Sequence, residues 1–148
     1  MIATLSHVNI RVANPVPSVE FYRAVGLDVV GSAVLSAGYY LIYLGSPVRD
    51  DITVELVINE SAGEDYDRSP GAGHIGLVVE DLDAALARLE EIGIRPETPP
   101  AHPAGREDLP RIAFVRDPDE VRVELIDRLF PTPQDKLDDS VRAALSLP

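Results

Sequence analysis

The chain has 148 residues and a formal net charge of −12, with an ordinary globular content of 45% hydrophobic residues. This acidic balance excludes nucleic acids and anionic membrane surfaces as partners, because both require a basic face. The sequence contains no cysteine, which excludes disulfides, thiolate nucleophiles and Cys-based zinc sites. No apolar run approaches the ~20 residues of a membrane span, and no basic-then-apolar leader opens the chain. We therefore expect a single cytoplasmic domain.

The first half of the chain has the pattern of one strand, one helix and three further strands. The elements expected in order are a strand over 5–12, a helix over 17–25, strands over 27–34 and 39–44, a polar loop over 45–51 and a strand over 52–58. Period-two alternation places His7, Asn9 and Arg11 on one face of the first strand. Glu55 faces away from the apolar row of the last strand.

The second half repeats this order after a polar linker over 59–72. The elements expected are a strand over 73–79, a helix over 81–92 capped by Asp81, a proline-rich loop over 96–110, and strands over 111–116 and 121–126. If the second half also has four strands, the first strand of its hairpin lies within the proline-rich stretch.

The C-terminal tail is expected to form a helix that Thr132 caps, with Pro133 at its first position. Leu137, Val141 and Leu145 form an apolar stripe that must pack on this body or on a second subunit. The predicted organisation is one domain over 1–130, with modules over 4–60 and 72–128, and a tail over 131–148.

Two His/Glu pairs at matching positions of the repeat are the main clue to function. His7 precedes Glu55 by 48 positions, and His74 precedes Glu124 by 50. Taken singly, such a histidine is more often structural, and a glutamate within a strand more often faces solvent. Recurrence in register favours metal ligation, because a pseudo-twofold axis between the halves would bring the four side chains together. Two imidazoles and two carboxylates suit one divalent ion, which could be nickel, cobalt, zinc, manganese or ferrous iron.

The sequence resembles the vicinal oxygen chelate superfamily over about residues 4–128, and within it most resembles glyoxalase I (lactoylglutathione lyase). The motifs that carry the resemblance are His7-Val-Asn-Ile-Arg-Val12, Phe21-Tyr-Arg-Ala-Val-Gly-Leu27, Val54-Glu-Leu56, Gly73-His-Ile75 and Ile112-Ala-Phe-Val-Arg-Asp-Pro-Asp-Glu-Val-Arg-Val-Glu-Leu-Ile126. The resemblance implies an α+β fold in which two tandem βαβββ modules form an open, cup-like mixed sheet around one metal. The C-terminal helix would be an addition to it.

The resemblance also implies roles for single residues. His7, Glu55, His74 and Glu124 match the metal ligands, and related dioxygenases use only two histidines and one glutamate around iron. The second carboxylate therefore favours a lyase or isomerase. Glu124 is the first candidate for the base that moves a proton beside a chelated carbonyl, with Glu55 its counterpart on the other substrate face. Family dimers often share sites between subunits, so we expect a homodimer with sites at the interface.

Arg11 and Asn59 match residues that hold the glutathione part of the glyoxalase I substrate, so the resemblance implies a small hemithioacetal-type substrate. The sequence departs from the family at two places. The turn 117–120 lacks the usual final glycine, and the loop that should bring lysine and glycine to the substrate is the proline-rich stretch. His102 in that loop is expected to face solvent.

Three other functions remain open. The first is a metal-dependent epimerase resembling methylmalonyl-CoA or cyclitol-ketone epimerases, which incorporates solvent deuterium without forming a C–S bond. The second is a metal-free ligand-binding or antibiotic-resistance protein resembling the bleomycin-sequestering members. The intact His/Glu set counts against it, whereas tight drug binding without metal would favour it. The third is thiol addition to an epoxide, which turnover of fosfomycin would reveal.

Overall fold

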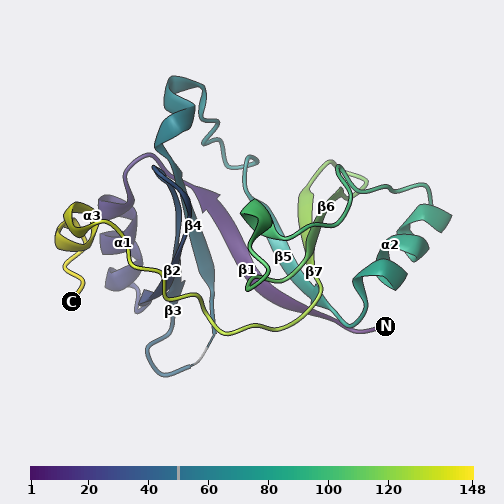
Figure 1. Ribbon diagram of the computed structural model, residues 1–148, viewed down its shortest axis with the longest axis horizontal. Helices are drawn as coiled ribbons and strands as arrows, with labels where there is room; N and C mark the ends of the chain where they lie inside the picture. The colour runs from purple at the N-terminus through teal and green to yellow at the C-terminus, as the bar shows by residue number, and fades with distance from the viewer. Residues whose placement is uncertain (50) are drawn as a thin grey trace.

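The computed structural model describes residues 1–49 and 51–148, so Asp50 of the expected loop 45–51 lies outside it. Within these ranges the strands form one seven-stranded mixed sheet in the order β2-β3-β4-β1-β5-β7-β6 (Figure 1). The sheet and its few helices confirm the predicted α+β class. None of the helices in this part of the chain combines the length and apolar character that crossing a bilayer requires.

The first half forms a complete βαβββ unit. Its elements are β1 (Ala3–Arg11), α1 (Pro15–Ala24), β2 (Asp28–Ser36), β3 (Tyr39–Gly45) and β4 (Val54–Asn59), followed by the short 3-10 helix η1 (Glu60–Asp65). Helix α1 begins two residues earlier than predicted, because the Asn14 side chain accepts a hydrogen bond from the Val16 amide (3.0 Å) and Pro15 takes the first position. β1 pairs with β4 in parallel, and β2, β3 and β4 form antiparallel pairs.

The second half has three strands where the first has four. Its elements are β5 (His74–Val79), α2 (Leu82–Glu91), the short 3-10 helix η2 (Pro103–Gly105), β6 (Ile112–Arg116) and β7 (Arg122–Ile126). The proline-rich stretch does not supply the fourth strand. It makes one isolated bridge, between Ala101 and Ile112, because proline lacks the amide hydrogen that a sheet ladder needs. The loop instead crosses toward β2 of the first half.

The two helices α1 and α2 cover the same face of the sheet at opposite ends (Figure 1). Val19 of α1 packs in a cluster with Leu56 and Ile58 of β4, and Leu82 of α2 packs in a second cluster with Leu125 of β7. Because side chains alternate along a strand, the neighbouring positions of β4 and β7 point to the opposite face. That opposite face forms the inside of the cup.

The tail does not form the helix predicted from Thr132. It runs beside the edge strand β2, where the Ser32 amide donates to the carbonyl of Pro133 (2.9 Å) and the Asp135 amide donates to the carbonyl of Ser32 (2.9 Å). Gly31 permits this approach, because a Cβ at that position would overlap Pro133 and Thr132. The strand edge has unpaired backbone groups to satisfy, and this pairing prevails over the local capping signal.

The apolar stripe of the tail packs on this chain's own body. Helix α3 (Asp139–Ala144) forms after the extended stretch, and Leu137 and Leu145 on either side of it are both buried in the cluster around Val19. The stripe therefore gives no support to a subunit interface.

Candidate metal centre

Four adjacent strands at the centre of the sheet carry the side chains predicted as metal ligands. His7 on β1 lies near Glu55 on the parallel neighbour β4, and His74 on β5 lies near Glu124 on the parallel neighbour β7. β1 and β5 pair with each other in antiparallel fashion, which brings the two halves together at the centre. The internal repeat seen in the sequence therefore corresponds to a spatial repeat inside the cup.

The ligating atoms of three of these side chains, His7, Glu55 and His74, form one close group, and Glu124 adjoins its two imidazoles. Nε2 of His7 lies 3.3 Å from Nε2 of His74, and Oε2 of Glu124 lies 3.4 Å and 3.5 Å from these two atoms. Oε1 of Glu55 lies 3.8 Å from Nε2 of His7, and the ligand atoms of His7, Glu55 and His74 all lie within 4.8 Å of one another. All four side chains come from the one chain described.

These separations and charges fit a divalent ion. Ligand atoms bound about 2.1 Å from one ion stand about 3 Å apart, so small side-chain rotations would complete the site. Burial lowers the pKa of His74 to about 4, which keeps its imidazole neutral and able to ligate near pH 7. Burial raises the pKa values of Glu55 and Glu124 above their ordinary range. A divalent cation would offset this cost of burying two carboxylates.

Neighbouring side chains hold the cluster in place. The hydroxyl of Ser6 lies 3.0 Å from Nδ1 of His7, and Nδ2 of Asn9 donates a 2.6 Å hydrogen bond to Oε1 of Glu55. The ring of Phe114 packs edge-on against that of His74, with centroids 5.0 Å apart. Such partners commonly fix the orientation of metal ligands.

The cluster forms the floor of a cavity of about 240 Å³. Its lining includes residues from both halves of the sheet, from the proline-rich loop and from the segment just before the tail, among them Arg11, Leu35, Tyr39, Tyr43, Pro103, Leu109, Phe114, Arg122 and Phe130. Tyr43 is buried, and burial raises the pKa of its phenol, which stays protonated.

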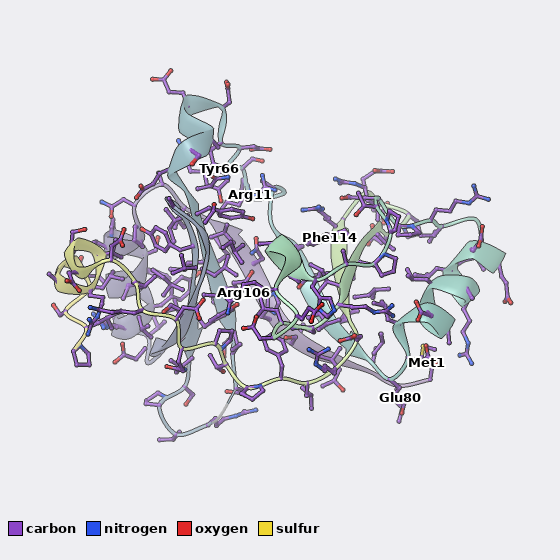
Figure 2. The ribbon with its side chains drawn as sticks, in the orientation of Figure 1. Met1, Arg11, Tyr66, Glu80, Arg106 and Phe114 are labelled. Carbon is purple, nitrogen blue, oxygen red and sulfur yellow. The ribbon has the colours of Figure 1, made fainter. Side chains whose placement is uncertain are left out.

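Arg11 is the cationic group of this cavity that lacks a carboxylate partner among the described residues. Its guanidinium lies 5.6 Å from the ring centre of Tyr66 (Figure 2). Arg122, by contrast, is paired with Glu97 (2.8 Å) and stacks on Phe114. An anionic group of a ligand could therefore pair with Arg11.

Asn59 does not line the cavity that contains the metal cluster. It lines a neighbouring cavity of about 290 Å³, which shares Arg11, Tyr39 and Val57 with the first. Its side-chain oxygen is buried and has no hydrogen-bond partner among the described residues. Arg11 thus stands between the predicted metal centre and Asn59.

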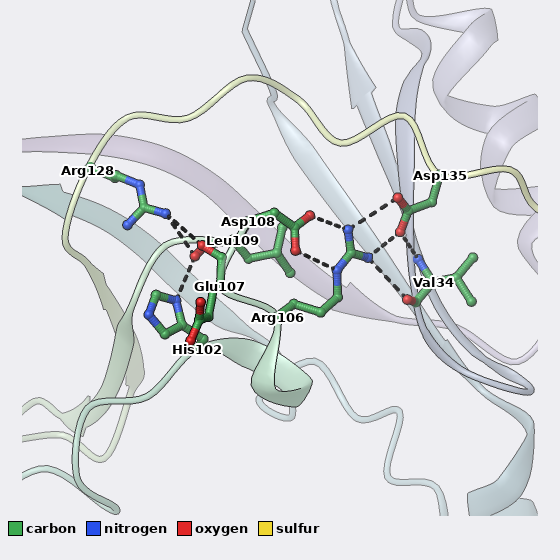
Figure 3. Close-up of polar contacts among 8 residues, drawn as sticks. All are labelled: Val34, His102, Arg106, Glu107, Asp108, Leu109, Arg128 and Asp135. Carbon is green, nitrogen blue, oxygen red and sulfur yellow. Dashed lines mark hydrogen bonds and ion pairs between the residues drawn. The ribbon is translucent and has the colours of Figure 1, made fainter.

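The proline-rich loop forms one wall of the cavity and is fastened at several points. Arg106 forms ion pairs with Asp108 (2.5 Å) and Asp135, and donates to the carbonyl of Val34 (3.2 Å), so it links the loop to the tail and to β2 (Figure 3). His102, expected to face solvent, is instead partly buried, with Nδ1 2.7 Å from the carbonyl of Leu109.

Sequence reasoning missed three contributors to the site. Asn9 shares a strand face with His7, so the alternation contained the signal for it. Tyr43 alternates in the same way on β3, but only the pairing of Tyr43 with Glu55 places it near the cluster. Gly76 has no sequence signal for its role, which depends on the His7 ring lying over it.

Comparison with known proteins agrees with this architecture. Residues 4–125 match the family model described as Glyoxalase/Bleomycin resistance protein/Dioxygenase superfamily. The lactoylglutathione lyase of Schizosaccharomyces pombe is 28% identical over 138 residues, which cover 83% of this chain and 44% of that protein. The lactoylglutathione lyase of Salmonella typhimurium is 30% identical over 130 residues, which cover 83% of this chain and 91% of that protein. The chain thus spans less than half the length of the first relative.

Two solved structures share the fold. A methylmalonyl-CoA epimerase from Streptomyces coelicolor has a TM-score of 0.65 at 22% identity, covering 90% of this chain and 100% of that one. An Mn(II)-bound glyoxalase from Novosphingobium aromaticivorans has a TM-score of 0.59 at 19% identity, covering 90% of this chain and 42% of that one.

Proposed function

Because the chain belongs to the glyoxalase/bleomycin resistance protein/dioxygenase superfamily, we propose that it is a divalent-metal-dependent lyase or isomerase that moves a proton beside a chelated carbonyl. The observation that carries this proposal is the close cluster of His7, Glu55 and His74 at the floor of the cavity, with Glu124 within 3.5 Å of both imidazoles. Two carboxylates buried beside two histidines favour a metal centre over a metal-free binding protein, because a cation would offset the cost of burying them.

His7, Glu55, His74 and Glu124 would hold one ion of nickel, cobalt, zinc, manganese or iron. When bound, such an ion supplies Lewis acidity, which makes the C–H bond beside a coordinated carbonyl easier to break. The Mn(II)-bound glyoxalase of the same fold supports manganese as one candidate.

The two glutamates would carry the proton between the carbon atoms. Oε2 of Glu124 lies 3.4 Å and 3.5 Å from the two imidazoles, and Glu124 would take the proton from the substrate carbon as the general base. Glu55 would face the substrate from the side of β4, opposite Glu124, and would be the second group in the proton transfer. The buried, protonated phenol of Tyr43 lines the same cavity and could donate a hydrogen bond to a substrate oxygen.

We propose a hemithioacetal-type substrate, in line with the lactoylglutathione lyase relatives at 28% and 30% identity. The cavity of about 240 Å³ suits the reacting part of such a molecule. A carboxylate of the thiol part would pair with Arg11, and the neighbouring cavity at Asn59 would receive the remainder.

An epimerase acting beside a carbonyl is the second candidate. The observation that favours it is the wall of the cavity formed by Pro103, Leu109 and Pro110, which belongs to the loop that departs from the glyoxalase I pattern. Methylmalonyl-CoA is the first substrate to test, and deuterium incorporation from solvent without C–S bond formation would identify this activity.

We further propose that the protein forms a homodimer. Leu5, Val8 and Ile75 are exposed apolar side chains on the helix-covered face, in the middle of the sheet where β1 and β5 pair. A monomeric mass by sedimentation at micromolar concentration would contradict this proposal.

The deciding experiment strips the protein with a chelator and restores nickel, cobalt, zinc, manganese or ferrous iron one at a time. Conversion of the methylglyoxal–glutathione hemithioacetal is then followed, with His74→Ala as the ligand control. We expect activity with at least one ion and none in the control. Glu124→Gln should retain bound metal but lose about 10²–10⁴-fold in turnover. Near-normal turnover by Glu124→Gln would refute the role of Glu124, and full activity of the stripped protein would refute metal dependence.

A further inference from the structure

The two halves of the metal centre differ at one position of the repeat. The residue two positions after His7 is Asn9, whereas the residue two positions after His74 is Gly76. Asn9 lies directly opposite Glu55 in the β1–β4 pair, and Gly76 lies directly opposite Glu124 in the β5–β7 pair. Each glutamate therefore faces an equivalent position on the neighbouring strand, but only the position that faces Glu55 carries a side chain.

Asn9 uses this position to hold Glu55. It is 5% exposed, and its Nδ2 donates to Oε1 of Glu55 over 2.6 Å, within the buried floor of the cavity. A hydrogen bond to an ionised carboxylate is about twice as strong as a neutral one and occupies one of the oxygen's acceptor directions. The carboxylate of Glu55 is therefore restrained against rotation about its terminal bond.

Gly76 gives Glu124 no such restraint. A Cβ at Gly76 would lie 2.6 Å from Cε1 of His7, so the imidazole fills the space that a side chain would need. Among the described residues, the carboxylate of Glu124 accepts no hydrogen bond from an amide, hydroxyl or guanidinium. Its close polar neighbours are the two imidazoles.

We propose that Asn9 is a positioning residue that gives the two carboxylates different roles, holding Glu55 as a fixed metal ligand while Glu124 remains free to move with the proton. This inference rests on the proposed function and adds the reason why Glu124, not Glu55, is the base. Both pairs come from the same repeat, so the asymmetry lies in the partner residues and not in the glutamates themselves.

A double-mutant cycle on zinc affinity tests the inference without any substrate. Zinc binding is measured by competition with a chromogenic chelator in Asn9→Leu, alone and combined with Glu55→Ala or Glu124→Ala. We expect Asn9→Leu to weaken zinc binding about 10–100-fold in the parent and in the Glu124→Ala background. In the Glu55→Ala background, Asn9→Leu should change zinc affinity by no more than about twofold, because the carboxylate that accepts the hydrogen bond from Asn9 is absent.

Two controls separate positioning from general damage. Ile10→Val changes the other face of β1, where the side chain packs on the core around Val19, and should leave zinc affinity unchanged. Asn9→Val removes the same amide but introduces a strong strand-forming residue, and it serves if Asn9→Leu does not fold. As a second readout, the visible absorption of the cobalt-loaded protein should change in Asn9→Leu, because a loosened carboxylate alters the coordination of the ion.

Each outcome bears on one claim. Equal weakening in both glutamate backgrounds, unchanged zinc affinity in Asn9→Leu, or an unchanged cobalt spectrum would overturn the positioning role and leave the proposed function intact. A parent protein that binds no divalent ion would overturn the proposed function and this inference with it.

Discussion

Replacing Gly76 by alanine would test the geometry of the metal centre without changing any proposed ligand. Gly76 lies in β5 with no positive φ, so alanine suits its backbone. A Cβ there would, however, lie 2.6 Å from Cε1 of His7, and 2.9 and 3.0 Å from the two ring nitrogens. The methyl group and the imidazole cannot occupy these positions together.

The size of the displacement follows from these distances. Ordinary van der Waals contact begins at 3.4 Å, so the His7 ring must retreat by about 0.8 Å. Metal–ligand distances hold to within about 0.2 Å, so a ring displaced that far no longer ligates. We expect divalent-metal affinity to fall at least tenfold, whereas overpacking costs about 1–3 kcal/mol in the free energy of unfolding and leaves the protein folded.

The assay is calorimetric titration of the metal-free protein with Mn²⁺, beside thermal unfolding. Gly71→Ala is the matched control, because a Cβ at Gly71 meets nothing within 4 Å. An affinity in Gly76→Ala equal to that of the control would refute the reasoning, since it would mean that the His7 ring is not held against β5 or does not ligate.

Three further changes test other parts of the molecule. Arg11→Gln should raise KM for an acidic substrate about 10–100-fold with little change in kcat, and an unchanged KM would exclude substrate pairing. Asp135→Asn should lower the melting temperature at pH 7 by about 2–4 °C, from about 1 kcal/mol. Arg106 lowers the pKa of Asp135 below 3.8, so the stabilisation from this ion pair is present above pH 3.8 and is lost as the pH falls below it. The difference in melting temperature between the parent protein and Asp135→Asn should therefore close in acid. A difference that stays constant with pH would contradict the pairing. Glu120→Gly should raise the melting temperature by about 2–4 °C, because Glu120 adopts a φ of 67° that suits glycine. Calorimetry measures the melting temperature, and a variant that melts below the parent would mean that the strain at Glu120 is negligible.

The sequence by itself determined the two-part organisation and the candidate ligands. Period-two alternation located the strands of both halves, and Asp81 marked the start of the second helix, where its side chain accepts from the Ala84 amide (2.9 Å). These are local signals, which depend on the period of side chains along a strand or a helix. The recurrence of the His/Glu pairs was visible for the same reason, since a repeat preserves spacing.

The tertiary structure decided what depends on contacts between distant segments. The helix signal at Thr132 was overridden by the open edge of β2, and the proline-rich loop became a wall of the cavity in place of a strand. The convergence of the four side chains within one chain, and the unequal partners Asn9 and Gly76, follow from strand register. Register is set by the packing of whole faces against the helices, so no single stretch of sequence contains it.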